Sequence, residues 1–211
     1  MNTLASQTSI LFIVSAPSGA GKTSLLRDLL ARDSRLSLSV SHTTRGMRPG
    51  EEDGVHYHFV DIPKFEQLAA EGVFIEHAQV FDNYYGTSEQ AVRDQLAAGQ
   101  DVVVEIDWQG AQQVRQRFPE AVSIFIVPPS VEALRERLSA RGQDSEETIR
   151  RRMRDARAEL SHYPEYDYLV INDVFEVALQ QLGSIVVAER LRTVPQAVRY
   201  QSTLEAMLGG A

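Results

Sequence analysis

The sequence predicts an α/β protein in which a mainly parallel β-sheet lies between two layers of helices. Two observations support this prediction. Apolar runs typical of buried strands alternate along the chain with stretches of helical periodicity, as in parallel strands joined by crossover helices. A glycine-rich turn also joins the first apolar run to the first helical stretch. With 211 residues, of which 43% are hydrophobic, the chain can bury a sizeable core.

The central sheet is expected to contain four strands. Residues 10–14 are apolar throughout, as in a strand that is buried on both faces. The other strands are expected at residues 101–107, 121–127 and 168–172. Leucines at helical spacing predict a helix over residues 23–30. Further helices are expected at residues 88–98, 108–118, 130–140, 145–161 and 174–191, with Ser130 as an N-cap and Asp144 and Glu147 as a capping box.

Residues 37–87 differ from the rest of the chain. Short strand-like pieces at residues 38–41, 56–60 and 74–80 alternate apolar and polar side chains, and one helical piece covers residues 63–71. This pattern predicts a small mixed lobe inserted after the first helix. Near the C-terminus, residues 193–208 predict an additional helix, whose apolar residues can pack on the core or on another subunit.

Composition excludes several classes of protein. The absence of cysteine excludes disulfides and thiolate metal sites. The net charge of −8 argues against general nucleic-acid binding. No apolar run approaches the ~20 residues of a membrane span, and the first nine residues lack the basic character of a signal peptide. We therefore expect a cytoplasmic protein that binds neither membranes nor nucleic acids, and the sequence leaves homo-oligomerisation open.

The glycine-rich turn predicts a phosphate-binding loop. Its sequence, Ala16-Pro-Ser-Gly-Ala-Gly-Lys-Thr23, follows the pattern G-x-x-x-x-G-K-[ST] except that Ala16 replaces the first glycine. Backbone N–H groups and the helix N-terminus would bind phosphate, Lys22 would reach the β- and γ-phosphates, and the Thr23 hydroxyl would face Mg²⁺. The predicted nucleotide-binding residues are Ala16, Pro17, Ser18, Gly19, Ala20, Gly21, Lys22, Thr23 and Ser24. We call residues 16–23 the phosphate loop.

Several segments together resemble guanylate kinase over residues 10–190. The matching blocks are the phosphate loop, Ser39-Val-Ser-His-Thr-Thr-Arg45, Arg48-Pro-Gly-Glu51, Asn83-Tyr-Tyr-Gly-Thr87, Glu105-Ile-Asp-Trp-Gln-Gly110 and Pro128-Pro-Ser-Val131. The resemblance implies a P-loop NTPase fold with an α/β/α core, and transfer of the ATP γ-phosphoryl group to GMP, with dGMP as a second acceptor. It also implies a domain over residues 9–191, with a core (9–36 and 88–191), a GMP-binding lobe (37–87) and a lid (141–152), followed by a helical tail (192–211).

The resemblance implies that GMP binds at the lobe. It assigns Arg45, Arg48, Tyr57 and Tyr85 to the GMP phosphate, whereas the residues alone equally allow the two arginines to decorate a polar turn. It assigns the guanine edge to Glu76, Ser41, Thr87 and Asp107, since a carboxylate accepts from both guanine donors at once. From the strand pattern alone, Glu76 would be an outward-facing polar residue.

Further polar residues are expected near the transferred phosphate. Glu105 and Asp107 share one face of a strand, and carboxylates there can hold arginines, contact GMP or orient Mg²⁺-bound water. Both are assigned to GMP, and Asp107 also to metal-bound water. The resemblance implies that Arg137, Arg141 and Arg152 contact phosphates, and Asn172 is a candidate for the adenine site. Arg150, Arg151 and Arg154 are expected to form a solvated helix face.

Two alternatives to a guanylate kinase stay open at this level. One is a P-loop kinase with a different phosphate acceptor, which the guanine-type carboxylate and the phosphate set of arginines and tyrosines disfavour. The other is a guanylate-kinase-like interaction module without catalysis, which the intact Lys22-Thr23 pair disfavours. The substrates that the sequence favours are therefore ATP with Mg²⁺ and GMP.

Overall fold

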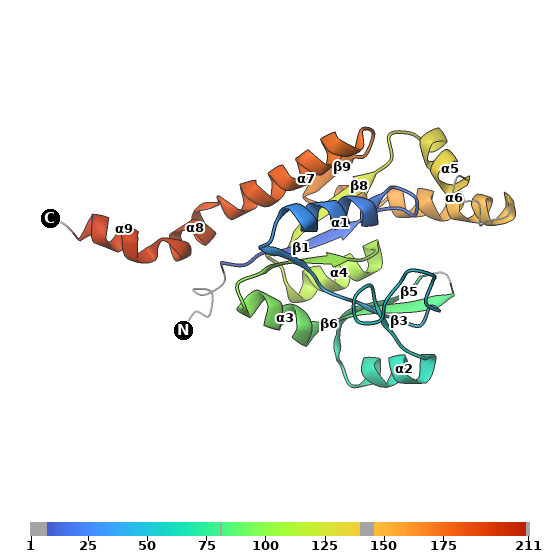
Figure 1. Cartoon of the computed structure of the whole chain (residues 1–211), viewed down its shortest axis with the longest axis horizontal. Coiled ribbons are helices and arrows are strands. Elements are labelled where there is room, and N and C mark those ends of the chain that lie inside the picture. The colour runs from blue at the N-terminus through green and yellow to red at the C-terminus, as the bar shows by residue number, and fades with distance from the viewer. Residues whose placement is uncertain (1–7, 81, 140–145, 210–211) are drawn as a thin grey trace.

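The computed structural model describes residues 8–80, 82–139 and 146–209. Its centre is a five-stranded sheet in the order β2-β7-β1-β8-β9 (Figure 1). The strands are β1 (Leu11–Ser15), β2 (Leu36–Leu38), β7 (Asp101–Glu105), β8 (Val122–Val127) and β9 (Tyr168–Ile171). All four neighbouring pairs in this sheet are parallel, which confirms the predicted sheet type.

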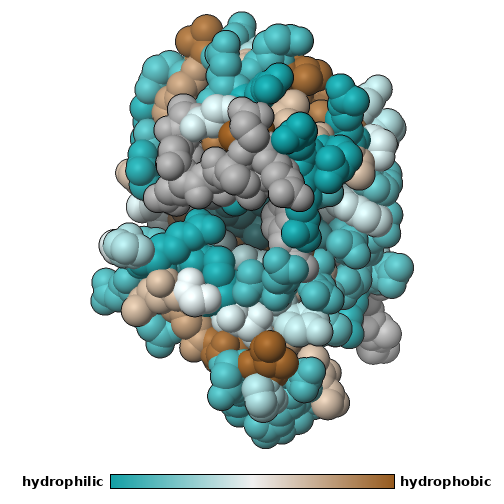
Figure 2. Space-filling view, turned by 90° about the vertical axis from the view of Figure 1, so that its right-hand side faces the viewer, coloured by the Kyte–Doolittle hydropathy of each residue, from teal (hydrophilic) through white to brown (hydrophobic). Residues whose placement is uncertain are grey.

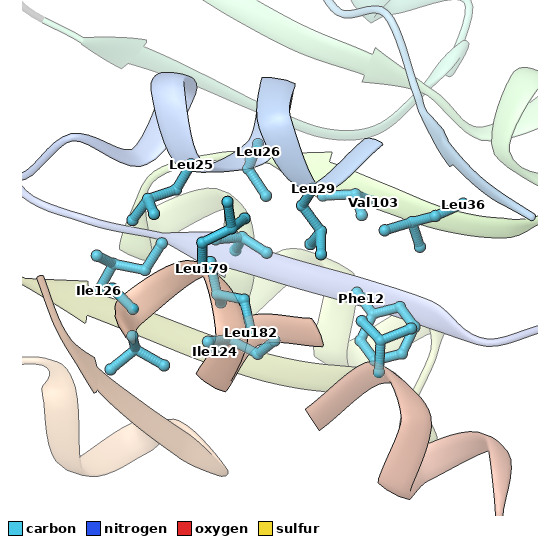
Figure 3. Close-up of a cluster of buried hydrophobic side chains, with 14 of the residues drawn as sticks. Phe12, Leu25, Leu26, Leu29, Leu36, Val103, Ile124, Ile126, Leu179 and Leu182 are labelled. Carbon is cyan, nitrogen blue, oxygen red and sulfur yellow. The ribbon is translucent and has the colours of Figure 1, made fainter. Parts of the chain in front are cut away.

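One face of the sheet is covered by α1 (Lys22–Arg32) and α7 (Phe175–Arg190). Phe12 of β1 points to this face, where it lies in one buried cluster with Leu25 and Leu29 of α1 and Leu182 of α7 (Figure 3). Val14 of β1 belongs to the same cluster. The opposite face of β1, which carries Leu11 and Ile13, packs against α3 (Glu89–Ala97) and α4 (Trp108–Arg117). Because alternate residues of a strand point to opposite faces, the two helical layers explain why residues 11–14 of β1 are all apolar.

The small lobe is a second, four-stranded sheet with one helix. Its strands β3 (His42–Thr43), β4 (His58–Phe59), β5 (Phe74–Val80) and β6 (Asn83–Ser88) follow the order β4-β3-β6-β5. Helix α2 (Ile62–Ala70) packs on this sheet through Phe65, whose ring stacks on Phe74 at 4.8 Å. The strand pairing is mixed, with β3–β4 parallel and β3–β6 and β5–β6 antiparallel.

The strands predicted for the lobe are partly wrong, and the short β3 lies outside all of the predicted pieces. The strand expected at residues 38–41 lies at Leu36–Leu38 and pairs with β7 in the central sheet, so it is not part of the lobe sheet. Strand β6 was not expected, because Asn83-Tyr-Tyr-Gly-Thr-Ser88 lacks the alternation of a half-buried strand. It forms because β5 offers an antiparallel partner along most of its length.

The remaining helices lie at the two ends of the molecule. Near the lobe, α5 (Val131–Ser139) packs on α6 (Glu146–Leu160) through Leu134, Leu138 and Ala156, and the short 3-10 helix η2 (Tyr163–Glu165) follows. The Ser130 hydroxyl accepts a hydrogen bond from the Ala133 N–H at 3.0 Å, which confirms the predicted N-cap. The expected capping residue Asp144 lies outside the described residues.

The C-terminal segment is helical but broken. Helices α8 (Thr193–Arg199) and α9 (Gln201–Leu208) replace the single helix expected over residues 193–208, and they extend away from the sheet (Figure 1). In the part of the chain that the structure describes, no helix combines the length and the apolar character needed to cross a membrane.

Candidate active site

A cavity of about 270 Å³ lies where the phosphate loop, the end of β7 and the lobe strands β5 and β6 meet. Figure 2 shows a hollow in the surface on the side of the molecule that carries α5, α6 and the lobe. Most of the predicted site residues line this cavity. They are Ala16, Pro17, Ser18, Gly19, Gly21, Lys22, Thr23, Ser24, Ser41, Tyr57, Glu76, Tyr85, Glu105 and Asp107.

The phosphate loop owes its shape to two glycines. Gly19 and Gly21 have φ angles of +91° and +92°, in the left-handed region that side chains disfavour. Gly21 is the N-cap of α1 and has no capping side chain, so the first N–H groups of the helix stay available to an anion. A Cβ atom on Gly21 would lie 2.4 Å from the Asn172 amide nitrogen, so glycine is needed here for space as well as for conformation.

Two predicted ligands of ATP support the phosphate loop from behind. The Asn172 side chain is buried, and its amide nitrogen donates to the Ala20 carbonyl at 2.7 Å. The Arg137 guanidinium donates to the carbonyls of Asn172 at 2.8 Å and Ala20 at 3.5 Å. These bonds tie α5 and the end of β9 to the loop. The predicted contacts of Asn172 with adenine and of Arg137 with phosphate stay predictions.

Lys22 and Thr23 face an acidic strand end. The Lys22 ammonium donates to the Ile106 carbonyl at 3.3 Å and lies 3.9 Å from the Glu105 carboxylate. The Thr23 hydroxyl donates to the same carboxylate at 2.6 Å. Asp107 caps α4, because its Oδ1 accepts from the Gly110 N–H at 2.8 Å. The strand end thus brings a hydroxyl and two carboxylates together at the start of α1.

Glu76 is buried at the lobe side of the cavity, with only 3% of its surface exposed. The interpretation of Glu76 as an outward-facing residue is therefore wrong. The pairing of β5 with β6 shifts register between Phe74 and Glu76, and this irregularity breaks the alternation, so that three consecutive residues are buried.

The Glu76 carboxylate belongs to a short chain of hydrogen bonds. The Thr87 hydroxyl donates to Glu76 at 2.6 Å, and the Ser41 and Thr87 hydroxyl oxygens lie 2.9 Å apart. Burial raises the pKa of Glu76 to about 7, the charge of Asp107 adds to this shift, and the Thr87 hydrogen bond opposes it. The result is a desolvated carboxyl group flanked by hydroxyls.

Tyr57 and Tyr85 line the neighbouring wall, with ring centroids 6.0 Å apart. Burial raises the pKa of Tyr57 to about 12, so its hydroxyl keeps its proton as a hydrogen-bond donor. The Arg45 guanidinium lies 5.4 Å from the centroid of the Tyr57 ring. Arg48 is exposed on the following turn. Thus three of the four predicted phosphate ligands cluster, and neither Arg48 nor Arg45 is among the residues that line the cavity.

Comparisons with known proteins show which family the chain belongs to. The family model described as Guanylate kinase matches residues 8–189. The chain belongs to the guanylate kinase family. It is 60% identical to a guanylate kinase from Chromohalobacter salexigens over 94% of this chain and 92% of that relative, and 59% identical to one from Hahella chejuensis over 94% and 95%. The crystal structure of guanylate kinase from Anaplasma phagocytophilum superposes with a TM-score of 0.77 at 33% identity, covering 94% of this chain and 95% of that one.

Glu51, which the sequence analysis missed, holds two arginines that are predicted to bind the GMP phosphate. The Glu51 carboxylate accepts two hydrogen bonds from the Arg45 guanidinium, at 2.7 and 3.0 Å, and one from the Arg48 N–H at 2.7 Å. The Arg45 guanidinium in turn holds the pKa of Glu51 below its usual range. Glu51 belongs to the Arg48-Pro-Gly-Glu51 block, but the sequence analysis gave it no role of its own.

Helix α6 contributes a second residue that was missed. Glu159 lines the cavity, and its carboxylate accepts from the Ser18 N–H of the phosphate loop at 3.2 Å. No signal in the sequence separates Glu159 from the other acidic residues of this arginine-rich helix. Arg151, expected on a solvated face, lies 4.0 Å from Asp82 of the lobe, although both side chains stay exposed. Arg152 lies on the same helix, and Arg141 lies outside the described residues.

Proposed function

We propose that this cavity is the active site in which the chain carries out the reaction of its family, the ATP-dependent phosphorylation of GMP to GDP. The observation that carries the proposal is that Lys22 of the phosphate loop and the buried Glu76 face the same cavity. One end of the cavity therefore carries anion-binding groups, and the other carries a carboxylate suited to the donor edge of guanine.

ATP would bind at the phosphate loop. Backbone N–H groups at the start of α1 and the Lys22 ammonium would hold the β- and γ-phosphates. The Thr23 hydroxyl, the Glu105 carboxylate and, through water, Asp107 would offer Mg²⁺ an oxygen-only set of ligands. Among the described residues no three His, Asp or Glu side chains form a metal cluster, which fits an ion held largely by substrate phosphates. Mg²⁺ would neutralise charge on these phosphates.

GMP would bind between the two tyrosines and Glu76. An ionised Glu76 would accept hydrogen bonds from N1–H and N2–H₂ of guanine, while the hydroxyls of Thr87 and Ser41 complete the edge. Adenine presents an acceptor at N1, which would leave a buried carboxylate facing a lone pair. Arg45, Arg48, Tyr57 and Tyr85 would hold the GMP phosphate with charge-assisted and neutral hydrogen bonds.

The reaction itself needs little covalent participation from the protein. The GMP phosphate attacks the γ-phosphorus atom of ATP, and ADP leaves on the opposite side. The protein would hold the two nucleotides in line, and Lys22 with the three arginines predicted to contact phosphates (Arg137, Arg141 and Arg152) would stabilise the charge on the transferring oxygens. Neither alternative function finds support in the comparisons, since the matched relatives are named guanylate kinases.

A coupled assay of ADP formation with GMP, dGMP, AMP and UMP tests the acceptor. We expect GMP to be the preferred acceptor and AMP and UMP to be poor ones. Equal turnover with AMP or UMP would contradict the guanine site. A protein that binds GMP but forms no ADP would instead favour an interaction module. A cytoplasmic location and the oligomeric state stay predictions.

A further inference from the structure

A carboxylate group contacts the phosphate loop where an anionic phosphate would bind. The Ser18 N–H donates to Oε2 of Glu159 at 3.2 Å, across 141 residues of sequence. Both residues line the cavity together with Lys22. Backbone N–H groups of phosphate loops are the donors that bind phosphate oxygens. The Glu159 carboxylate therefore uses a donor that the phosphates of ATP also need.

The charges around Glu159 make it a competitor of ATP rather than a neutral support. Burial raises the pKa of Glu159 to about 7. The charge of Lys22 and the Ser18 N–H favour the ionised form, whereas Asp107, before α4, and Asp155, on the same helix, disfavour it. A bound triphosphate would add several negative charges beside this carboxylate and engage both Lys22 and Ser18. Ionised Glu159 and the triphosphate would therefore repel each other and compete for the same donors.

Glu159 lies near the C-terminal end of α6, between Arg152 and the ring of His162. Just after α6, the His162 ring stacks on Trp108 of α4 with centroids 3.7 Å apart, so this end is fixed to the core. In the other direction, Arg152 lies seven residues earlier, which is two turns and about 10 Å along the same helix face. Ala156, between Arg152 and Glu159, packs on Leu134 and Leu138 of α5. Losing the contact between Glu159 and Ser18 would therefore loosen α6 on the side of the phosphate loop, while its contacts with α5 and α4 stay.

We propose that Glu159 is a latch: its carboxylate holds α6 against the phosphate loop, and the terminal phosphates of ATP displace it and so loosen α6 from the loop. This inference rests on the proposed binding of ATP at the phosphate loop. Glu159 is a positioning residue and takes no part in the transfer of the phosphoryl group. The latch links the arrival of ATP to the freedom of the helix that brings Arg152 to the site.

Binding of a non-hydrolysable ATP analogue with Mg²⁺, measured by calorimetry at pH 8, tests the latch. Glu159→Gln keeps the size of the side chain and a hydrogen-bond acceptor but removes the charge. We expect it to bind the analogue roughly tenfold more tightly, which corresponds to about 1.4 kcal/mol of binding free energy. This value lies near the lower end of the contribution of a hydrogen bond to a charged group. Glu136→Gln, at an exposed position on α5, is the matched control and should bind like the wild type. Equal or weaker binding by Glu159→Gln would overturn the latch.

The pH dependence separates a latch from a general structural effect. Because wild-type Glu159 gains a proton as the pH falls from 8 to 6, the difference in analogue affinity between wild type and Glu159→Gln should close over this range. A difference that stays constant would overturn the proposal. Hydrogen exchange adds an independent readout: α6 amides should exchange faster in Glu159→Gln than in Glu136→Gln without nucleotide, and equal rates would argue against a helix held by Glu159.

Lys22→Ala distinguishes failure of the latch from failure of the proposed site. If Lys22→Ala weakens analogue binding and Glu159→Gln changes nothing, ATP binds at the phosphate loop and only the latch is wrong. If Lys22→Ala binds the analogue like the wild type, the proposed ATP site itself is wrong. Circular dichroism and thermal melting confirm that each variant is folded before its affinity is compared.

Discussion

Replacing Glu76 with glutamine should reduce the use of GMP far more than the binding of ATP. The Glu76 carboxylate is 3% exposed and already accepts from the Thr87 hydroxyl. Glutamine keeps the size but replaces one acceptor oxygen with an N–H₂ donor, which would face a guanine donor in a desolvated pocket. Leaving a buried hydrogen-bonding group unsatisfied costs about 1–3 kcal/mol, which corresponds to a roughly 5- to 150-fold loss in kcat/KM for GMP.

Protein stability provides a check on this experiment. The pKa of Glu76 is raised from 4.5 to about 7 in the folded protein, so folding favours the protonated form and the wild type loses stability as the pH rises from 4.5 through 7. Glutamine does not titrate, so the variant should melt no lower than the wild type at pH 8.

The coupled assay is run with GMP and AMP on the wild type, on Glu76→Gln and on Glu66→Gln. The last variant makes the same substitution at an exposed position of α2 in the same lobe, so it should behave like the wild type. If Glu76→Gln keeps full efficiency with GMP and still rejects AMP, the assignment of Glu76 to guanine is wrong.

Three further predictions concern the two ends of the cavity. Lys22→Ala should abolish most turnover while the circular dichroism spectrum stays unchanged. Near-normal turnover would contradict the proposal that ATP binds at the phosphate loop through Lys22. The KM for GMP should rise roughly tenfold as the pH falls from 8 to 6, because the pKa of Glu76 is about 7 and its ionised fraction falls from roughly nine tenths to roughly one tenth. If Glu76→Gln shows the same dependence of KM on pH, another group is responsible. Gly21→Ala should lower the free energy of unfolding by about 1–3 kcal/mol, because φ is +92° and the new Cβ would lie 2.4 Å from Asn172. Gly46→Ala is the control, because a Cβ there would lie in open space, and its melting temperature should equal that of the wild type. If Gly21→Ala also melts at the wild-type temperature, the steric argument is wrong.

The central sheet and the phosphate loop were predictable because their signals are local. A strand covered on both faces must be apolar at each position, and β1 shows this over Leu11–Val14. The left-handed Gly21 and the following Lys22-Thr23 pair stand together in the sequence, so their joint geometry follows from a short motif. The lobe residues assigned to GMP came from the resemblance, since each is an ordinary polar side chain when taken alone.

The sequence by itself determined the parallel α/β core, the phosphate loop and the family, because periodicity and motif spacing are properties of short segments. Only the tertiary structure decided that Glu76 points inward, since an irregular β5–β6 pairing breaks the alternation that predicted the opposite. It also decided that Asn172 supports the phosphate loop and that Glu159 reaches it from α6. Burial and hydrogen-bond partners depend on segments that are distant in sequence, and no local pattern encodes which of several similar side chains will meet.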